Sequence, residues 1–180
     1  MCTYRTVDIT TFARFLGLSM LSQGISVSPL KLQKLLYYQQ AWHMAIFGRN
    51  NQLFSEAPQA WVNGPVYPEV YQQYKGMVPG MCDHLKDENF GATPDNRLDE
   101  ISRLYDELGL NDDEMRLFTS VMTLYGSKTQ NQLILLTHAE QPWSEAREGL
   151  LPFEHSERSI SLDTMCNYYR ERWERRRSSK

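Results

Sequence analysis

The sequence has few cysteines, and none of them has the spacing of a cross-link or a zinc site. There are three, Cys2, Cys82 and Cys166, and no Cys-X-X-Cys pair occurs. Widely separated cysteines in an odd number indicate neither a disulfide framework nor a zinc ribbon. The chain is therefore expected to fold in a reducing compartment, and a cytoplasmic localisation fits best.

The chain also lacks a long apolar segment. Its N-terminal apolar run, FLGLSML at residues 15–21, is far shorter than the ~20 residues that cross a bilayer. Asp8 and Arg14 precede this run, and no small-residue cleavage site follows it, so it does not have the form of a signal peptide. We expect a soluble protein that does not enter a membrane.

Familiar catalytic motifs are missing as well. The sequence contains no GxGxxG or GxxxxGK[ST] phosphate loop, no GxSxG turn and no HExxH zinc motif. The four histidines, His43, His84, His138 and His155, lie far apart along the chain, and this spacing does not indicate a metal site. These absences favour a protein that is not an enzyme, with no cofactor and no metal ion.

The segment THAEQPW, at residues 137–143, keeps one catalytic alternative open. His138 and Glu140 lie near a predicted helix end, and a His–Glu pair in a cleft can perform acid–base chemistry, as in a small hydrolase. The interpretation that we favour is structural. Thr137, His138 and Glu140 would then cap backbone groups at the helix end, while Pro142 and Trp143 start and anchor the next helix.

Charge is distributed unevenly. The chain as a whole is slightly acidic, with a net charge of −3, whereas residues 170–180 contain six basic and two acidic residues. A basic tail on an acidic body can bind nucleic acid. The alternative is a solvated helix end, because arginine is favoured near the C-terminal pole of a helix dipole. The residues concerned are Arg170, Arg172, Arg175, Arg176 and Arg177.

The hydrophobic pattern predicts a mainly α-helical protein. With 180 residues, 41% of them hydrophobic, the chain suits one compact domain of six to seven helices with one short β segment or hairpin. We place this domain at residues 1–169 and a basic helix end or tail at residues 170–180. Helices are expected from Asp8 or Thr10, at residues 97–108 and 112–125, and from about Ser161. Residues 76–95 are expected to form a long loop.

Residues 28–49, SPLKLQKLLYYQQAWHMAIFGR, predict the most clearly bounded helix. Ser28 is a good N-cap, Pro29 suits the first helical position, and Gly48 can end the helix. Leucines fall on one broad face, and further apolar residues widen the coverage. A helix that is apolar over most of its circumference is usually central to its domain.

A turn is predicted at Asn63-Gly64, within PQAWVNGPV at residues 58–66. Residues before the turn have the composition of a short strand. Gly64 is expected at positive φ or against neighbouring backbone, where a Cβ atom would clash, and Pro65 restricts the exit towards Val66. The turn should fix the angle between the strand with Trp61 and the short helix that follows.

Aromatic residues cluster in the same part of the chain. Tyrosine and tryptophan bury a large area yet keep a polar tip, so they are common both in cores and at interfaces. Most of this set is expected in the core, with some members at its rim as a docking surface. His43 is more typical of a partly buried, hydrogen-bonded residue than of a ligand. The candidates for partner binding are Tyr37, Gln40, His43, Trp61, Tyr67, Tyr71 and Tyr74.

Three ordered blocks together resemble a known family. SPLKLQKLLYYQQAWHMAIFGR, AWVNGPVYPEVYQQYKG and YGSKTQNQLILLTHAEQPWSEAR are similar, in that order, to the Panacea domain of antitoxins, also known from phage-associated GepA-like proteins. The similarity covers roughly residues 7–147. The second block usually has Tyr-Gly-Pro-Val, whereas Asn63 precedes Gly64-Pro65-Val66 here, a change that keeps the turn chemistry.

The resemblance implies a mostly helical, non-enzymatic antitoxin whose partner is a cognate toxin encoded beside it and neutralised by direct binding. Some relatives act instead as adaptors that deliver the toxin to a protease, and some carry a DNA-binding region. A proteolytic adaptor and a nucleic-acid-binding repressor that uses the basic tail therefore remain as alternatives, and a homo-oligomer is compatible with the sequence. The resemblance does not indicate which face of the domain binds the toxin.

Overall fold

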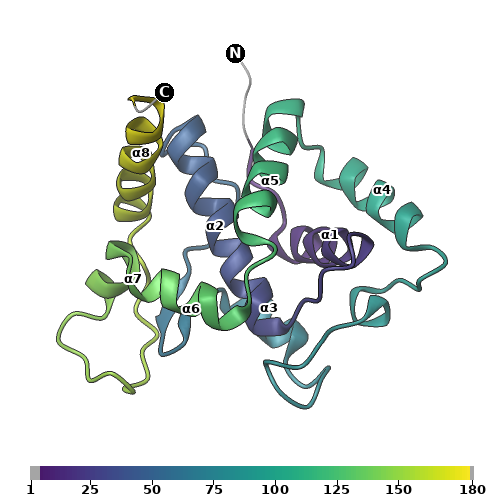
Figure 1. Ribbon diagram of the computed structural model, residues 1–180, viewed down its shortest axis with the longest axis horizontal. Coiled ribbons are helices and arrows are strands. Elements are labelled where there is room, and N and C mark those ends of the chain that lie inside the picture. Colours follow the sequence, from purple (N-terminus) through teal and green to yellow (C-terminus); the bar gives the residue numbers. More distant parts are fainter. Residues whose placement is uncertain (1–4, 179–180) are drawn as a thin grey trace.

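A computed structural model describes residues 5–178, and within this range the chain forms eight α-helices, one 3₁₀-helix and a two-stranded hairpin (Figure 1). The predicted mainly helical fold with one hairpin is confirmed, with eight α-helices where six to seven were expected. Cys2 and the last two residues of the predicted tail lie outside the described range. The elements are α1 (Ile9–Ser22), α2 (Pro29–Phe47), β1 (Gln59–Trp61), β2 (Gly64–Val66), α3 (Pro68–Tyr74), the 3₁₀-helix η1 (Asp87–Phe90), α4 (Arg97–Leu108), α5 (Asp112–Tyr125), α6 (Gln130–His138), α7 (Gln141–Ala146) and α8 (Leu162–Ser178).

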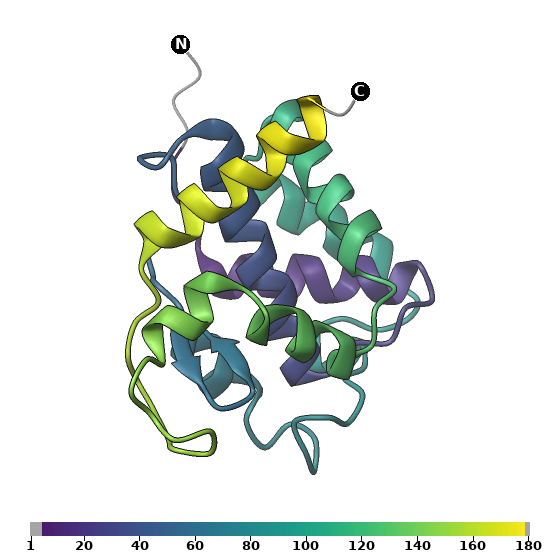
Figure 2. The ribbon, with the colours of Figure 1, turned by 60° about the vertical axis from the view of Figure 1, so that its left-hand side comes forward.

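Helix α2 is the centre of the fold. Ser28 caps it by accepting a hydrogen bond from the amide of Lys31 at 3.1 Å, Pro29 is its first residue, and Gly48 follows its last residue with a φ of +108°. Helices α8 and α5 pack against opposite flanks of α2, and α1 crosses it (Figures 1 and 2). Because neighbours surround α2, nearly all of its side chains are buried.

A second layer forms around α1, which packs against α4 and η1. Gly17 permits this packing, since a Cβ atom at this position would lie 2.3 Å from the ring of Phe90. An ion pair holds η1 against the start of α4, with Arg97 Nε 2.6 Å from a carboxylate oxygen of Asp87. Arg97 also donates to the carbonyl of Leu21 at 3.0 Å. Residues 76–95, predicted as an irregular loop, therefore include a short ordered helix.

The hairpin turn lies one residue earlier than predicted. Strands β1 and β2 pair antiparallel with Trp61 opposite Gly64, so Val62 and Asn63 are the two turn residues and Gly64 is the first residue of β2. Gly64 has a φ of +96°, which confirms the predicted conformation. On its other edge β1 forms a bridge between Gln59 and Ser159, and the hairpin is thereby tied to the segment that leads into α8.

The basic stretch at the C-terminal end continues a helix. Residues 170–178 belong to α8, which contacts both α2 and α7. No helix in residues 5–178 is long and apolar enough to cross a membrane.

Candidate partner-binding site

Polar side chains of α2 point into the interior and bind the backbone of neighbouring segments. Gln40 accepts hydrogen bonds from the amides of Leu53 and Phe54 at 2.8 and 2.9 Å and donates to the carbonyl of Phe54 at 3.0 Å. Gln33 binds Tyr67 in the same way, accepting from its amide at 2.7 Å and donating to its carbonyl at 3.3 Å. Buried glutamines thus satisfy loop backbone groups that would otherwise lack partners.

His43 is buried on the same helix. Its Nδ1 lies 2.8 Å from the carbonyl oxygen of Asn51, and its Nε2 lies 3.1 Å from a carboxylate oxygen of Glu114. Burial alone would raise the pKa of Glu114, but hydrogen bonds from His43 and from the Asn111 amide lower it. Both ring nitrogens therefore face acceptors, and the imidazole connects α2 to the first turn of α5.

Lys34 lies beneath the hairpin with no exposed surface. Its Nζ atom donates to the carbonyl oxygen of Pro65 at 2.9 Å. A Cβ atom on Gly64 would lie 2.8 Å both from Cε of Lys34 and from Oγ1 of Thr137. Removal from water disfavours the charged amine and lowers the pKa of Lys34 to about 7. The glycine thus allows a buried lysine to reach a strand carbonyl.

The THAEQPW segment packs against the same hairpin. Trp143 donates from Nε1 to the carbonyl of Trp61 at 2.9 Å, and its ring stacks on His138 with 3.9 Å between the ring centroids. Thr137 is buried and donates to the carbonyl of Ile134 at 2.9 Å. Burial, and next the charge of Lys34, lower the pKa of His138. These contacts join the end of α6 and the start of α7, which includes Pro142, to the hairpin.

Glu140 points the other way, into a group of buried tyrosines. Its carboxylate accepts hydrogen bonds from the hydroxyls of Tyr169 and Tyr38, and Arg172 lies 3.7 Å away. Burial raises the pKa of Glu140 to about 7, although the Tyr169 hydrogen bond and the charge of Arg172 act in the opposite direction. Glu140 therefore joins α8 to α2. It has different partners from His138, so the two residues do not form the acid–base pair considered from the sequence.

Five of the seven candidates for partner binding lie in the core, as was expected for most of the set, and are therefore not at an accessible surface. Neighbouring elements cover most of α2, and only its C-terminal part, from Trp42 to Phe47, borders a groove, while α3 packs against α1 and α2. The hairpin, the neighbouring loop and the adjacent helices cover the side of α2 that carries Tyr37, Gln40 and His43. The exposed fractions are 0% for Tyr37, Gln40 and Tyr67 and 1% for His43 and Tyr74.

Only Trp61 and Tyr71 of that set are partly exposed. Their rings lie 4.8 Å apart in an edge-to-face arrangement, and Trp61 also contacts His155 at 5.6 Å. The neighbouring loop presents two large apolar side chains to solvent, Leu151 with 72% and Phe153 with 89% of its surface exposed. This face is the first apolar surface considered as a partner site.

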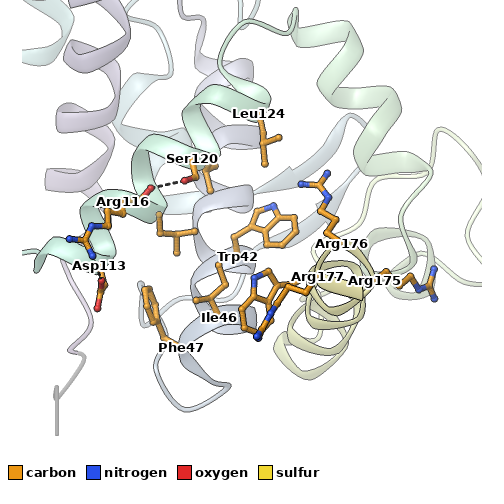
Figure 3. Close-up of a pocket in the computed structure, with 13 residues that line it drawn as sticks. Trp42, Ile46, Phe47, Asp113, Arg116, Ser120, Leu124, Arg175, Arg176 and Arg177 are labelled. Carbon is orange, nitrogen blue, oxygen red and sulfur yellow. Dashed lines mark hydrogen bonds and ion pairs between the residues drawn. The ribbon is translucent and has the colours of Figure 1, made fainter. Parts of the chain in front are cut away.

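The other surface is a groove between α5 and α8, with α2 as its floor (Figure 3). Its volume is about 1090 Å³. The floor and both walls are largely apolar, and arginines lie at the rim. Its lining includes Trp42, Ile46 and Phe47 from α2, Leu117, Val121 and Leu124 from α5, and Trp173, Arg176 and Arg177 from α8.

The arginines predicted as a nucleic-acid site point in different directions. Arg170 donates to the sulfur of Cys166 at 3.3 Å, and Arg172 donates to the hydroxyl of Tyr168 at 3.0 Å. Arg175, Arg176 and Arg177 all line the groove, but the guanidinium of Arg175 is directed away from the other two (Figure 3) and pairs with Glu171 at 3.4 Å. The five side chains therefore do not form a single basic face.

Comparison with known families decides the classification. Residues 32–144 match the family described as antitoxin SocA-like, Panacea domain. The chain belongs to this family. Neither a characterised protein nor a solved structure matches it.

The Panacea match extends from α2 to α7, and so includes the hairpin, the Lys34–Gly64 contact and the THAEQPW segment. The matched segment contains α5 and all of α2 except its first three residues, and α8 is outside it. No group of histidine, cysteine and acidic side chains in residues 5–178 could hold a metal ion.

Sequence reasoning missed the groove because it sought a partner surface among the aromatic residues and did not consider α5. One apolar stripe of α5 includes Val121 and Tyr125, both of which are buried. A second stripe, Leu117, Val121 and Leu124, follows the spacing i, i+4, i+7 and forms the wall of the groove. This second stripe was a detectable signal of a helix with apolar residues on more than its core face.

Proposed function

We propose that this Panacea-domain protein is an antitoxin that neutralises a toxin encoded beside it by binding the toxin directly. Membership of the antitoxin family supports the general role. The observation that carries the direct mechanism is the open apolar groove between α5 and α8, because solvated apolar surface of this kind is typical of protein-binding sites. In this proposal the protein blocks the toxin by remaining bound to it and performs no chemical step.

The internal contacts support a rigid binder. Buried polar side chains of α2 fix the loops around it, and Glu140 fixes α8 against α2. A preorganised surface loses little conformational entropy on binding, which favours affinity.

Co-expression tests the proposal. The adjacent gene is induced alone and together with this protein, and colony growth and the toxin level are measured. Direct neutralisation predicts arrested growth with the neighbour alone, restored growth with both, an unchanged toxin level, and a complex that co-purifies. A neighbour that is harmless alone, or still toxic in the presence of this protein, contradicts the proposal.

The toxin level separates this mechanism from the adaptor alternative. An adaptor would lower the toxin level, and growth would again arrest in a strain that lacks the responsible protease. A reporter driven by the promoter of the operon tests the repressor alternative in the same strains, since a repressor would lower reporter expression in the absence of the toxin.

A further inference from the structure

We propose that the groove between α2, α5 and α8 binds an acidic amphipathic helix of the toxin. This inference rests on the proposed function and specifies the site and the chemistry of the partner segment. Three properties of the groove carry it: the apolar character of its floor, the backbone geometry of its walls and the charge at its rim.

The apolar lining is continuous across the three helices. Leu117, Val121 and Leu124 of α5 line the same groove as Trp42 of α2, and Figure 3 shows Leu124 and Trp42 on the same side of it. Leu124 has 38% of its surface exposed although it is a large aliphatic side chain. Covering such surface with a partner's apolar side chains is favourable by ~25 cal/mol per Å².

The walls determine the conformation of the occupant. Both are α-helices, whose backbone groups are largely bonded within the helix, so the groove has no strand edge with which an extended segment could pair. A segment that enters must therefore satisfy its own backbone hydrogen bonds, as a helix does. Asp113 and Leu124, at the two ends of the α5 wall, lie about three helical turns apart. The groove thus accommodates a helix of about three turns with apolar residues on one face.

The rim determines the charge of the occupant. Arg176 and Arg177 lie over the rings of Trp42 and Trp173, at 5.7 and 4.8 Å from the ring centroids. On the opposite wall Arg116 is paired with Asp113 at 2.9 Å, so the excess positive charge is on the α8 side. A helix with aspartate or glutamate along the edge that faces α8 would complement it.

These features favour a protein helix over nucleic acid. Bases bind single-stranded sites by stacking on aromatic rings, and the two tryptophans here each lie beneath an arginine. The α5 residues that line the groove include no aromatic ring. Phosphate binding requires several aligned cations, whereas Arg175 points away from its two neighbours (Figure 3).

Two matched pairs of variants test the proposal. Leu124→Glu introduces a carboxylate that would repel an acidic helix in the groove and replaces an apolar contact with a polar group. Leu135→Glu makes the same change on α6, where the leucine is 69% exposed. Arg176→Glu reverses a charge at the rim, and Arg158→Glu reverses an exposed charge outside the groove lining. Each full-length variant is titrated with the purified product of the adjacent gene, and circular dichroism verifies that it is folded.

The proposal predicts that Leu124→Glu and Arg176→Glu each weaken binding at least tenfold, and that Leu135→Glu and Arg158→Glu change it less than threefold. Binding by the wild-type protein should also weaken as salt is raised. If the wild type binds and neutralises its neighbour but the two groove variants do so equally well, the site is wrong while the proposed function stands. If the wild type neither binds nor neutralises it, the proposed function and this inference both fail. Binding of duplex DNA through Arg176, without binding of the neighbour, also overturns the inference.

Discussion

The side chain of Lys34 occupies the space that a Cβ atom on Gly64 would need. The two residues come from the central helix and from the hairpin, and their separation is so small that only glycine fits opposite the lysine. The contact brings the hairpin backbone directly onto α2, where the lysine amine binds Pro65. Several measurable properties depend on this arrangement.

Substitution at Gly64 should destabilise the fold. Gly64→Ala should cost roughly 1–3 kcal/mol through the positive φ and more through displacement of Lys34. Gly24→Ala is the control, because Gly24 also has a positive φ, of +70°, but a methyl group added there would have no other atom within 4 Å. Urea unfolding should therefore show a larger loss for Gly64→Ala, and equal losses would mean that the contact with Lys34 adds nothing.

Lys34 should make stability rise with pH above neutrality. Its native pKa of about 7 lies below the usual lysine pKa of 10.5, so between these values the unfolded chain binds more protons than the native one. The free energy of unfolding should then increase by up to about 1.4 kcal/mol per pH unit. Below pH 7 both states are protonated and the contribution is constant. Lys34→Met should remove this slope, and parallel curves for the two proteins between pH 7 and 10 would contradict the assignment.

Glu140 should make stability fall as pH rises, over a lower pH range than that of Lys34. Its native pKa of about 7 lies above the usual glutamate pKa of 4.5, so the native state binds more protons between these values and stability falls as pH rises through them. Glu140→Gln should remove this decline. Tyr169→Phe deletes a hydrogen bond that lowers the pKa of Glu140, so it should extend the decline to higher pH. Denaturant unfolding from pH 4.5 to 8 measures both effects, and an unchanged profile for Glu140→Gln would exclude the carboxylate as the source.

Arg147 should control the order of the loop before α8. Its guanidinium donates to the carbonyls of Ala60, Leu151 and Glu154 at 2.9, 3.1 and 2.8 Å. Lysine keeps the charge but cannot bind three divergent acceptors, so Arg147→Lys should cost about 2–3 kcal/mol and accelerate amide exchange in residues 148–156. Arg158→Lys is the control, since Arg158 is exposed and its change should cost less than about 0.5 kcal/mol. Similar exchange rates in the two variants would refute the role given to Arg147.

Local signals predicted the elements well. The Ser28–Pro29 start of α2 and the bounds of α4 and α5 were evident because caps and apolar spacing act within a few residues of the helix ends. The polar interior of α2 was not predictable, since the partners of Gln33 and Gln40 lie in distant loops. A buried glutamine and an exposed one are identical in the sequence. The groove was missed for a related reason: it is formed by three helices whose relative positions depend on tertiary packing.

The groove also combines two parts of the chain with different relationships to the family. The segment that matches the Panacea domain ends at residue 144, before α8 begins at Leu162. One wall, with Trp173, Arg176 and Arg177, thus comes from a part of the chain outside the matched segment. The other wall and the floor come from helices within that segment. Substitutions at a few positions of α8 can alter the charge and shape of that wall while every residue of the matched domain stays the same. Partner choice could then diverge faster than the fold, which would be visible as variation concentrated in α8 among chains with a similar matched segment.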